Sequence, residues 1–279
     1  MSDEAQRERA ARFLQLHRGP KILVLPNAWD AASARIFELA GFGAIGTTSG
    51  GIANSHGYPE PQRIPRDEMV AAVGQIVQAV AVPVSADIEA GYGSSPTAIA
   101  ETVRATIEAG AVGINLEDSP GVDGSSLIEI AAQQDRIRAI RETARKVGVA
   151  IVINARTDVY LHAIGGRDAR FGNAVARANA YREAGADSSF VPGVVDADLI
   201  GKLVRAINGP VNVLVQPGMP SSSELEKLGV ARVSVGSGPM RAAMGLVRRI
   251  AIELHDEGTY TSILEGAIPY PELNHVLRR

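Results

Sequence analysis

The chain has 279 residues, of which 46% are hydrophobic and 21% charged, and its 28 basic and 31 acidic side chains give a formal net charge of −3. This balance, without a long basic run, offers no electrostatic surface for a nucleic-acid backbone or an anionic membrane, so we expect a small-molecule partner. The absence of cysteine excludes disulfides, thiolate metal sites and a cysteine nucleophile. The polar N-terminus and the lack of an apolar run of membrane-spanning length predict a soluble, cytosolic (cytoplasmic) protein.

Eight short apolar runs, rich in β-branched residues, alternate with amphipathic helical stretches along the chain, which predicts repeated strand–helix units. The runs cover residues 22–25, 44–47, 82–86, 112–116, 150–154, 189–191, 211–215 and 232–235. The helical stretches that follow them cover residues 31–40, 66–79, 96–109, 127–147, 168–184, 196–207, 221–228 and 240–257. Several stretches end in a glycine, such as Gly41, Gly110 and Gly185, which supplies the left-handed stop before the next strand.

Strands that lack polar alternation are buried on both faces, and right-handed crossovers that close after eight units form a barrel. We therefore predict an α/β protein, a (β/α)8 barrel of the TIM type that forms one domain over residues 1–279, with a C-terminal helical extension from about residue 240. A doubly wound open sheet is the alternative fold. The tail after residue 257 is expected to pack on the barrel or on a neighbouring subunit.

In barrels of this type, the catalytic residues lie at the carboxyl ends of the strands. Asp87 and Glu89 leave the third predicted strand two residues apart and run into a glycine turn, and Glu117 follows the next strand. Such an oxygen-only cluster repels itself unless a cation or a proton intervenes, and it suits a hard divalent ion that keeps several waters. We expect Mg²⁺, with Mn²⁺ as the alternative, and not zinc, because the chain has no cysteine and none of its five histidines lies at a predicted strand end with ligand-like spacing. Histidines such as His17 and His162 are expected to have surface or core roles. A surface loop that happens to be acidic is the competing interpretation.

Arg156 follows the fifth predicted strand and so faces the same mouth of the barrel. Its guanidinium can bind a carboxylate or phosphonate through two hydrogen bonds, or it can form a structural salt bridge to Asp158 or Glu117, and the two roles can coexist. After the second strand, Thr48-Ser49-Gly50 form a small-residue turn whose backbone N–H groups could bind an oxyanion or carboxylate.

Five segments, taken in order, resemble the isocitrate lyase/phosphoenolpyruvate mutase superfamily: Pro26-Asn27-Ala28-Trp29-Asp30, Thr48-Ser49-Gly50-Gly51, Ala86-Asp87-Ile88-Glu89-Ala90-Gly91-Tyr92-Gly93, Leu116-Glu117-Asp118 and Asn154-Ala155-Arg156-Thr157-Asp158. The resemblance covers nearly the whole chain and implies a barrel whose last helix is exchanged between partners, in a homo-oligomer that is a dimer or a tetramer. It also implies Mg²⁺ near Asp87, Glu89 and Glu117, often through water.

The resemblance further implies how a 2-oxo acid or dicarboxylate substrate binds. Its 2-oxo carboxylate would lie on the metal beside Asp87 and on the turn formed by Thr48, Ser49 and Gly50, and Arg156 would bind its far anionic group. Glu60 stands where the superfamily usually has an aspartate near the metal waters. Asn212 and Arg241 fall at positions that contact substrate in methylisocitrate lyase-like members. The residues expected to carry catalysis are Arg156, Glu117, Tyr92 and Glu60, with Tyr92, Glu60 or a metal-bound water as proton carrier.

The chain departs from the superfamily in two places. The Lys-Lys-Cys-Gly-His loop of isocitrate and methylisocitrate lyases is absent after Asp118, and Pro192 stands where phosphoenolpyruvate mutase has a histidine. We therefore expect a Mg²⁺-dependent lyase or hydrolase that cleaves a C–C or P–C bond in an oxaloacetate-like or phosphonopyruvate-like 2-oxo acid through an enolate-type intermediate. A phosphoenolpyruvate mutase-type phosphonomutase and a non-catalytic barrel that binds or senses a 2-oxo acid are the alternatives.

Overall fold

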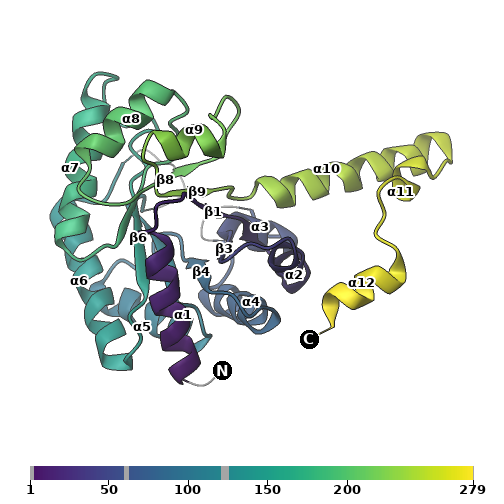
Figure 1. Ribbon diagram of the computed structural model, residues 1–279, viewed down its shortest axis with the longest axis horizontal. Coiled ribbons are helices and arrows are strands. Elements are labelled where there is room, and N and C mark those ends of the chain that lie inside the picture. The colour runs from purple at the N-terminus through teal and green to yellow at the C-terminus, as the bar shows by residue number, and fades with distance from the viewer. Residues whose placement is uncertain (1–2, 60–62, 121–125, 279) are drawn as a thin grey trace.

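Nine parallel strands form one ring-shaped sheet in the computed structural model, which describes residues 3–59, 63–120 and 126–278 (Figure 1). In chain order the strands are β1 (Leu23–Leu25), β2 (Asn27–Ala28), β3 (Ile45–Thr47), β4 (Val84–Asp87), β5 (Gly113–Glu117), β6 (Val152–Arg156), β7 (Ser188–Phe190), β8 (Val211–Leu214) and β9 (Arg232–Ser234). Their order in the sheet is β1-β9-β8-β7-β6-β5-β4-β3-β2. From β2 to β9, each strand therefore pairs with the next strand along the chain.

Pro26 separates two short strands: β1, within the first predicted run, and β2, just beyond its end. Together they close the ring. Proline has no backbone N–H to donate to a strand ladder, while its carbonyl accepts a hydrogen bond from Gly46 N at 2.8 Å. β1 pairs in parallel with β9, with Leu23 opposite Arg232, whereas β2 pairs with β3, with Asn27 opposite Gly46. The segment joins the two ends of the sheet into a nearly closed barrel, which confirms the predicted (β/α)8 fold.

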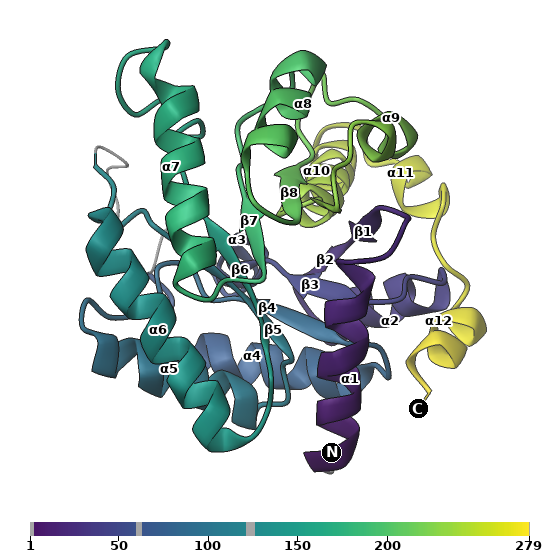
Figure 2. The same ribbon diagram turned by 60° about the vertical axis from the view of Figure 1, so that its left-hand side comes forward.

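Helices surround the outer face of the barrel (Figure 2). They are α2 (Ala31–Leu39), α4 (Arg66–Ala79), α5 (Pro96–Glu108), α6 (Ile130–Val147), α7 (Ala169–Glu183), α8 (Ala197–Ala206) and α9 (Ser222–Lys227), and they match the predicted stretches to within a few residues. Strand side chains such as Ile114, Ile153 and Val213 are completely or almost completely buried. The neighbouring residues Asn115, Asn154 and Asn212 face the other way and are at most 4% exposed. Both faces of the sheet are therefore buried, as the runs predict, but the inner face is polar.

An N-terminal helix, α1 (Asp3–Leu16), is additional to the predicted elements. It is polar over most of its surface, but it buries Gln6, Ala10 and Phe13, which are three or four residues apart and so share one face. The Phe13 ring lies against Gly113 at the start of β5, where an added Cβ would come within 2.5 Å of the ring. Because Gly113 is at the amino end of its strand, α1 covers the amino-terminal end of the barrel.

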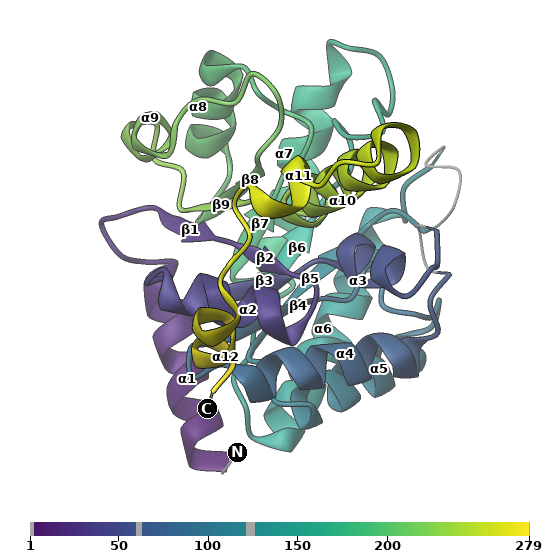
Figure 3. The same ribbon diagram turned by 90° about the vertical axis from the view of Figure 1, so that its right-hand side faces the viewer.

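The last segments of the chain leave the barrel. α10 (Gly238–Ile252) projects away from it and continues into a π-helical turn, η1 (Glu253–Glu257), after which the chain returns through α11 (Thr261–Leu264) to α12 (Tyr270–Leu277) (Figure 1). α12 lies beside α2, where Arg35 Nε donates a hydrogen bond to the Val276 carbonyl at 3.1 Å (Figure 3). No helix within the described ranges is long and apolar enough to cross a membrane.

Candidate active site

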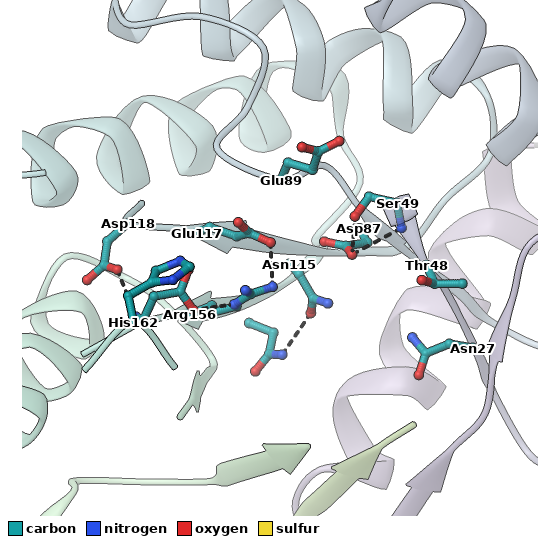
Figure 4. A network of polar contacts seen from close by, with 12 residues as sticks. Asn27, Thr48, Ser49, Asp87, Glu89, Asn115, Glu117, Asp118, Arg156 and His162 are labelled. Atoms are coloured by element: carbon teal, nitrogen blue, oxygen red, sulfur yellow. Dashed lines mark hydrogen bonds and ion pairs between the residues drawn. The ribbon is translucent and has the colours of Figure 1, made fainter. Parts of the chain in front are cut away.

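Three charged side chains end three neighbouring strands at the carboxyl end of the barrel (Figure 4). Asp87 is the last residue of β4, Glu117 of β5 and Arg156 of β6. The strand register places Glu117 opposite Arg156, and Asp87 opposite Asn115, two residues before Glu117. The structure thus brings these three predicted site residues together at one mouth of the barrel.

Asp87 is held by the first turn of α3 (Ser49–Ser55), a short helix that directly follows β3. Its Oδ2 accepts hydrogen bonds from Ser49 Oγ at 2.8 Å and from the Ser49 backbone N–H at 3.2 Å. Its Oδ1 is buried and has no hydrogen-bond partner among the described residues. Burying a carboxylate oxygen without a partner is costly, so Oδ1 is a natural attachment point for a cation.

The predicted turn at Thr48, Ser49 and Gly50 is the start of this helix. Thr48 caps it, because its Oγ1 accepts a hydrogen bond from Gly51 N at 3.2 Å. All three candidate residues are buried. Since Ser49 binds Asp87 through both its side chain and its backbone, the turn supports the acidic group in addition to any contact with substrate.

Glu89 and Tyr92 lie in a loop with a strained backbone. Their φ angles are +51° and +54°, in the left-handed region that residues with a side chain rarely adopt, and each such residue costs about 1–3 kcal/mol. The Tyr92 hydroxyl donates to Glu89 Oε1 at 3.0 Å, and Glu117 N donates to the Glu89 carbonyl at 2.9 Å. Burial and the Glu89 carboxylate raise the pKa of Tyr92 far above its usual range, so the hydroxyl keeps its proton.

Arg156 lies between two carboxylates. Its Nη1 is paired with Glu117 Oε1, and its Nε donates to Asp158 Oδ1 at 2.6 Å. Burial alone would lower the pKa of Arg156, but Glu117 and Asp158 raise it, so the guanidinium stays charged. Burial raises the pKa of Glu117 well above its ordinary value, although Arg156 opposes this shift. The two ion pairs use two of the five N–H donors of the guanidinium, which leaves donors for a substrate anion.

The remaining candidates are Asn212, Arg241 and Glu60. Asn212, in β8, is fully buried in the barrel wall, where its Nδ2 donates to Ser234 Oγ at 3.1 Å. Arg241, near the start of α10, is exposed and lines a cavity of about 490 Å³ together with Asn54 of α3. Glu60 lies outside the described residues.

A polar layer inside the barrel was not identified from the sequence. Arg232, at the start of β9, is fully buried, and it donates through Nε to Ser234 Oγ at 3.1 Å and through Nη2 to Asn115 Oδ1 at 3.3 Å. Asn154 Nδ2 donates to the same oxygen of Asn115 at 2.8 Å. Burial lowers the pKa of Arg232 to about 9, although Asp87 opposes this shift. The sequence signal that could have identified this layer is Arg232 itself, a charged residue at the start of an otherwise apolar run.

His162 was expected to have a surface or core role, but the structure places it beside a residue of the candidate site. Its Nε2 is 3.7 Å from Asp158 Oδ2, a buried oxygen that has no hydrogen-bond partner in the described part of the chain (Figure 4). Asp158 therefore connects Arg156 to His162. Asp118, in contrast, has a structural role, because its Oδ2 accepts a hydrogen bond from the Tyr181 hydroxyl at 2.8 Å.

Within residues 3–59, 63–120 and 126–278, no group of three or more His, Cys, Asp or Glu side chains is arranged to bind a metal ion by itself. The acidic residues are nonetheless neighbours, because Asp87 and Glu89 both raise the pKa of Glu117 electrostatically, after the larger effect of burial. A hard cation that keeps several waters needs only one or two direct carboxylate ligands. The oxygen donors present are therefore of the type that suits a hard divalent cation.

Comparison with known proteins places this site in a family. A family model described as phosphoenolpyruvate phosphomutase matches residues 13–255. The chain is 38% identical to an uncharacterized protein of Mycobacterium tuberculosis over 94% of each chain, and 28% identical to 2,3-dimethylmalate lyase of Eubacterium barkeri over 96% of this chain and 93% of the relative. A crystal structure from Burkholderia cenocepacia J2315, provisionally classed as a lyase/mutase, is 40% identical and covers 98% of this chain and 96% of its own, with a TM-score of 0.91. The chain belongs to the phosphoenolpyruvate phosphomutase family, within the isocitrate lyase/phosphoenolpyruvate mutase superfamily.

Proposed function

We propose that the protein is a Mg²⁺-dependent lyase or hydrolase that breaks a C–C or P–C bond in a small 2-oxo acid of the oxaloacetate or phosphonopyruvate type. The observation that carries the proposal is the unpartnered Asp87 Oδ1 at the same barrel mouth as the charged Arg156 guanidinium. A cation site and a fixed positive charge at one mouth of the barrel suit a substrate with an anionic group at each end. The relationship to an enzyme named 2,3-dimethylmalate lyase supports bond cleavage as the reaction type.

The acidic residues of the mouth would hold the metal. Asp87 would bind it directly, and Glu89 and Glu117 would bind it through water, an arrangement that Mn²⁺ also accepts. When bound, the ion supplies Lewis-acid chemistry, because it neutralises the negative charge that develops on the 2-oxo oxygen as the adjacent bond breaks. Ser49 orients Asp87 for this role through its two hydrogen bonds.

The other residues of the mouth would orient the substrate and move the proton. Arg156 binds the far anionic group, and its two ion pairs hold the guanidinium in place before the substrate arrives. The Tyr92 hydroxyl holds a proton beside Glu89 and is the candidate donor to the carbon released by cleavage. Glu60 is the second candidate for this proton transfer.

Two substitutions favour this reaction over those of better-known relatives. The chain has no cysteine, so it lacks the acid/base group of the isocitrate and methylisocitrate lyases that it resembles. Pro192 replaces the histidine of phosphoenolpyruvate mutase. The match to the phosphoenolpyruvate phosphomutase family over residues 13–255 nevertheless makes a phosphonomutase the second candidate.

A substrate panel tests the proposal. Pure protein with Mg²⁺ is incubated with oxaloacetate, phosphonopyruvate, methylisocitrate and isocitrate, while the formation of oxalate, pyruvate, glyoxylate, phosphate and phosphoenolpyruvate is followed. We expect cleavage of oxaloacetate or phosphonopyruvate that chelation of the metal abolishes. Conversion of phosphonopyruvate into phosphoenolpyruvate would indicate the mutase instead. No turnover above the protein-free background would overturn the enzyme assignment and favour a protein that only binds a 2-oxo acid.

We also propose a homo-oligomer, a dimer or a tetramer, in which α10 is exchanged between subunits. α10 projects from its own barrel and exposes Met244, Val247 and Ile252 to 47%, 54% and 52%. A row of exposed large apolar side chains is typical of an interface. Light scattering at micromolar concentration should give at least twice the monomer mass of 29.3 kDa, and a monomeric species would contradict the exchange.

A further inference from the structure

Two buried polar side chains on α6 contact the backbone at the ends of β4 and β5. Gln133 and Arg136 are three residues apart and so lie on the same face of the helix, and they are 0% and 3% exposed. Gln133 Nε2 donates to the Glu117 carbonyl at 3.0 Å, and Gln133 Oε1 accepts a hydrogen bond from Arg136 Nη1 at 2.7 Å. The strand that presents Glu117 is therefore tied to Arg136 through Gln133.

Arg136 extends this connection to the loop after β4. Its Nη2 donates to the Ala90 carbonyl and, at 3.3 Å, to the Gly93 carbonyl. These carbonyls lie in the loop that carries Glu89. Hydrogen bonds thus run without interruption from the end of β5, through Gln133 and Arg136, to the loop at the end of β4.

Apolar packing does not account for a guanidinium at this place. A cavity of about 550 Å³ separates the loop from α6 and is lined by Ala90, Gly93, Ala132 and Arg136 among others, so hydrogen bonds support the loop on this side. Burial lowers the pKa of Arg136, and its Nε has no hydrogen-bond partner in the described residues. Burying a charge in this way is costly compared with an apolar side chain of similar size.

The loop requires such support because two of its residues have a strained backbone. Glu89 and Tyr92 both have positive φ angles, and strained conformations persist only where the surrounding structure holds them. The Glu117 N–H also donates to the Glu89 carbonyl at 2.9 Å, so the two acidic segments are joined directly as well as through α6. Loss of the α6 contacts would let the loop relax and move Glu89 away from Glu117.

We propose that Gln133 and Arg136, the α6 clamp, are positioning residues that fix the Glu89 and Glu117 carboxylates at the separation required by a divalent cation and its waters. The identity of the ligand rests on the proposed function, whereas the clamp is a property of the metal-free protein. Neither residue touches the reacting atoms, since both act through the backbone.

Arg141 provides a matched control on the same helix. Its Nε and Nη1 donate to the carbonyls of Gly185 and Ile151, each at 2.6 Å. Those two residues precede β7 and β6, at the amino end of the barrel. Arg136→Lys and Arg141→Lys therefore make the same chemical change at opposite ends of the barrel. We expect the first to affect the acidic residues at the carboxyl end and the second to leave them unchanged.

The test measures Mn²⁺ binding to the substrate-free protein from the electron paramagnetic resonance of the free ion. It compares the wild type with Arg136→Lys, Gln133→Met and Arg141→Lys. We expect the first two to weaken Mn²⁺ binding by about tenfold or more, the effect typical of residues that orient metal ligands, and Arg141→Lys to leave it unchanged within about twofold. Equal affinity in all four proteins, or an equal loss in Arg141→Lys, would overturn the proposal. Gln133→Met keeps the side-chain size, so it provides the test if Arg136→Lys does not fold.

Hydrogen exchange of residues 88–93 in the metal-free proteins separates failure of the clamp from failure of the proposed function. Exchange should be about tenfold faster in Arg136→Lys and Gln133→Met and unchanged in Arg141→Lys, because the clamp ties the Ala90 and Gly93 carbonyls of this loop to α6 and Arg141 does not contact the loop. If the wild type binds no Mn²⁺, the proposed function fails and the clamp is judged on exchange alone. Unchanged exchange in both clamp variants overturns the clamp.

Discussion

The two ends of the barrel differ in what they bury. At the carboxyl end, Asp87 Oδ1 and Asp158 Oδ2 are buried without a hydrogen-bond partner in the described part of the chain. At the amino end, the Phe13 ring is 0% exposed and lies against Gly113. An unpartnered buried carboxylate oxygen lowers stability, whereas close aromatic packing raises it. Among the described residues, the unpartnered buried atoms near the amino end, such as His17 Nε2 and Arg232 Nη1, are not carboxylate oxygens. The carboxyl end is therefore built for binding and the amino end for stability, and substitutions at the two ends should separate these properties.

Asp87→Ala should have the largest effect on turnover, and it should impair metal binding at the carboxyl end without lowering stability. We expect metal-dependent turnover to fall by at least about 10,000-fold, more than about 5 kcal/mol of transition-state stabilisation. The free energy of unfolding should change by less than about 1 kcal/mol, since the side chain contributes little to packing. Kinetics with Mg²⁺ and urea unfolding measure the two effects, with the exposed Asp198→Ala on α8 as control. Loss of folding in Asp87→Ala would point to a structural role instead.

Phe13→Ala should produce the converse result at the amino end. Removing a fully buried aromatic ring is expected to lower the free energy of unfolding by about 3–5 kcal/mol, because the cavity left behind is filled only in part. Mn²⁺ affinity of the folded fraction should stay within about twofold of the wild type, since α1 and the acidic mouth lie at opposite ends of the strands. A large change in affinity would show that the two ends are coupled.

His17 should make the amino end sensitive to acid. Burial, with help from Arg232, lowers the pKa of His17 to about 4, and its Nδ1 donates to the Phe13 carbonyl at 2.8 Å. The unfolded chain, with an ordinary histidine pKa of about 6.5, binds the proton more readily. The neutral histidine therefore stabilises the fold fully above pH 6.5, and this contribution, about 3 kcal/mol in all, is lost as the pH falls through 4.

Urea unfolding at pH 7, 5.5 and 4.5 measures the contribution of His17. Other groups titrate over the same range, so the comparison is with His17→Asn, which keeps a donor for the Phe13 carbonyl but cannot ionise. The loss of stability between pH 7 and 4.5 should be smaller in this variant. Parallel stability curves for the two proteins would contradict the neutral, buried state of His17.

Tyr92→Phe should have the smallest effect on the stability of the metal site, apart from any loss of proton transfer, and should sharpen the description of the binding end. It removes the hydrogen bond from the hydroxyl to Glu89 Oε1, which is 3.0 Å long in the wild type. A single bond of this kind contributes about 1 kcal/mol, so we expect Mn²⁺ binding to weaken by about three- to tenfold. Isothermal titration measures the change, and an unaltered affinity would show that Glu89 is oriented without Tyr92.

The order of strands and helices follows from the sequence because each barrel strand is a local apolar run. The third, fourth and fifth runs were predicted to end at residues 86, 116 and 154, whereas the strands end at Asp87, Glu117 and Arg156. From the local sequence, a charged residue at a strand end is predicted to lie in a loop. It pairs with the neighbouring strand because the barrel brings that strand beside it. α3 was predicted as a turn because glycine disfavours helix. The structure gives a reason for glycine within this helix: a Cβ at Gly51 would come within 2.5 Å of Thr48.

The grouping of Asp87, Glu117 and Arg156 could be predicted because parallel strands end at one edge of a barrel. The ion pairs of Arg156 with Glu117 and Asp158 were also predicted, and the structure contains both. The contacts of the polar layer inside the barrel could not be predicted, since they join distant parts of the chain. Arg232 and Asn115 are 117 residues apart and meet only inside the closed barrel. Arg136 lies on an amphipathic helix, where a charged residue is normally solvated, and only the structure shows that it is buried.

The most direct test of the account is anomalous diffraction from crystals grown with Mn²⁺ and a 2-oxo acid. We predict a single Mn²⁺ peak at the barrel mouth, bonded to Asp87 Oδ1 and joined to Glu89 and Glu117 through water, with the far end of the acid on Arg156. The absence of a peak there, with Asp87 held instead by a basic side chain, would contradict the claim that these carboxylates form a cation site.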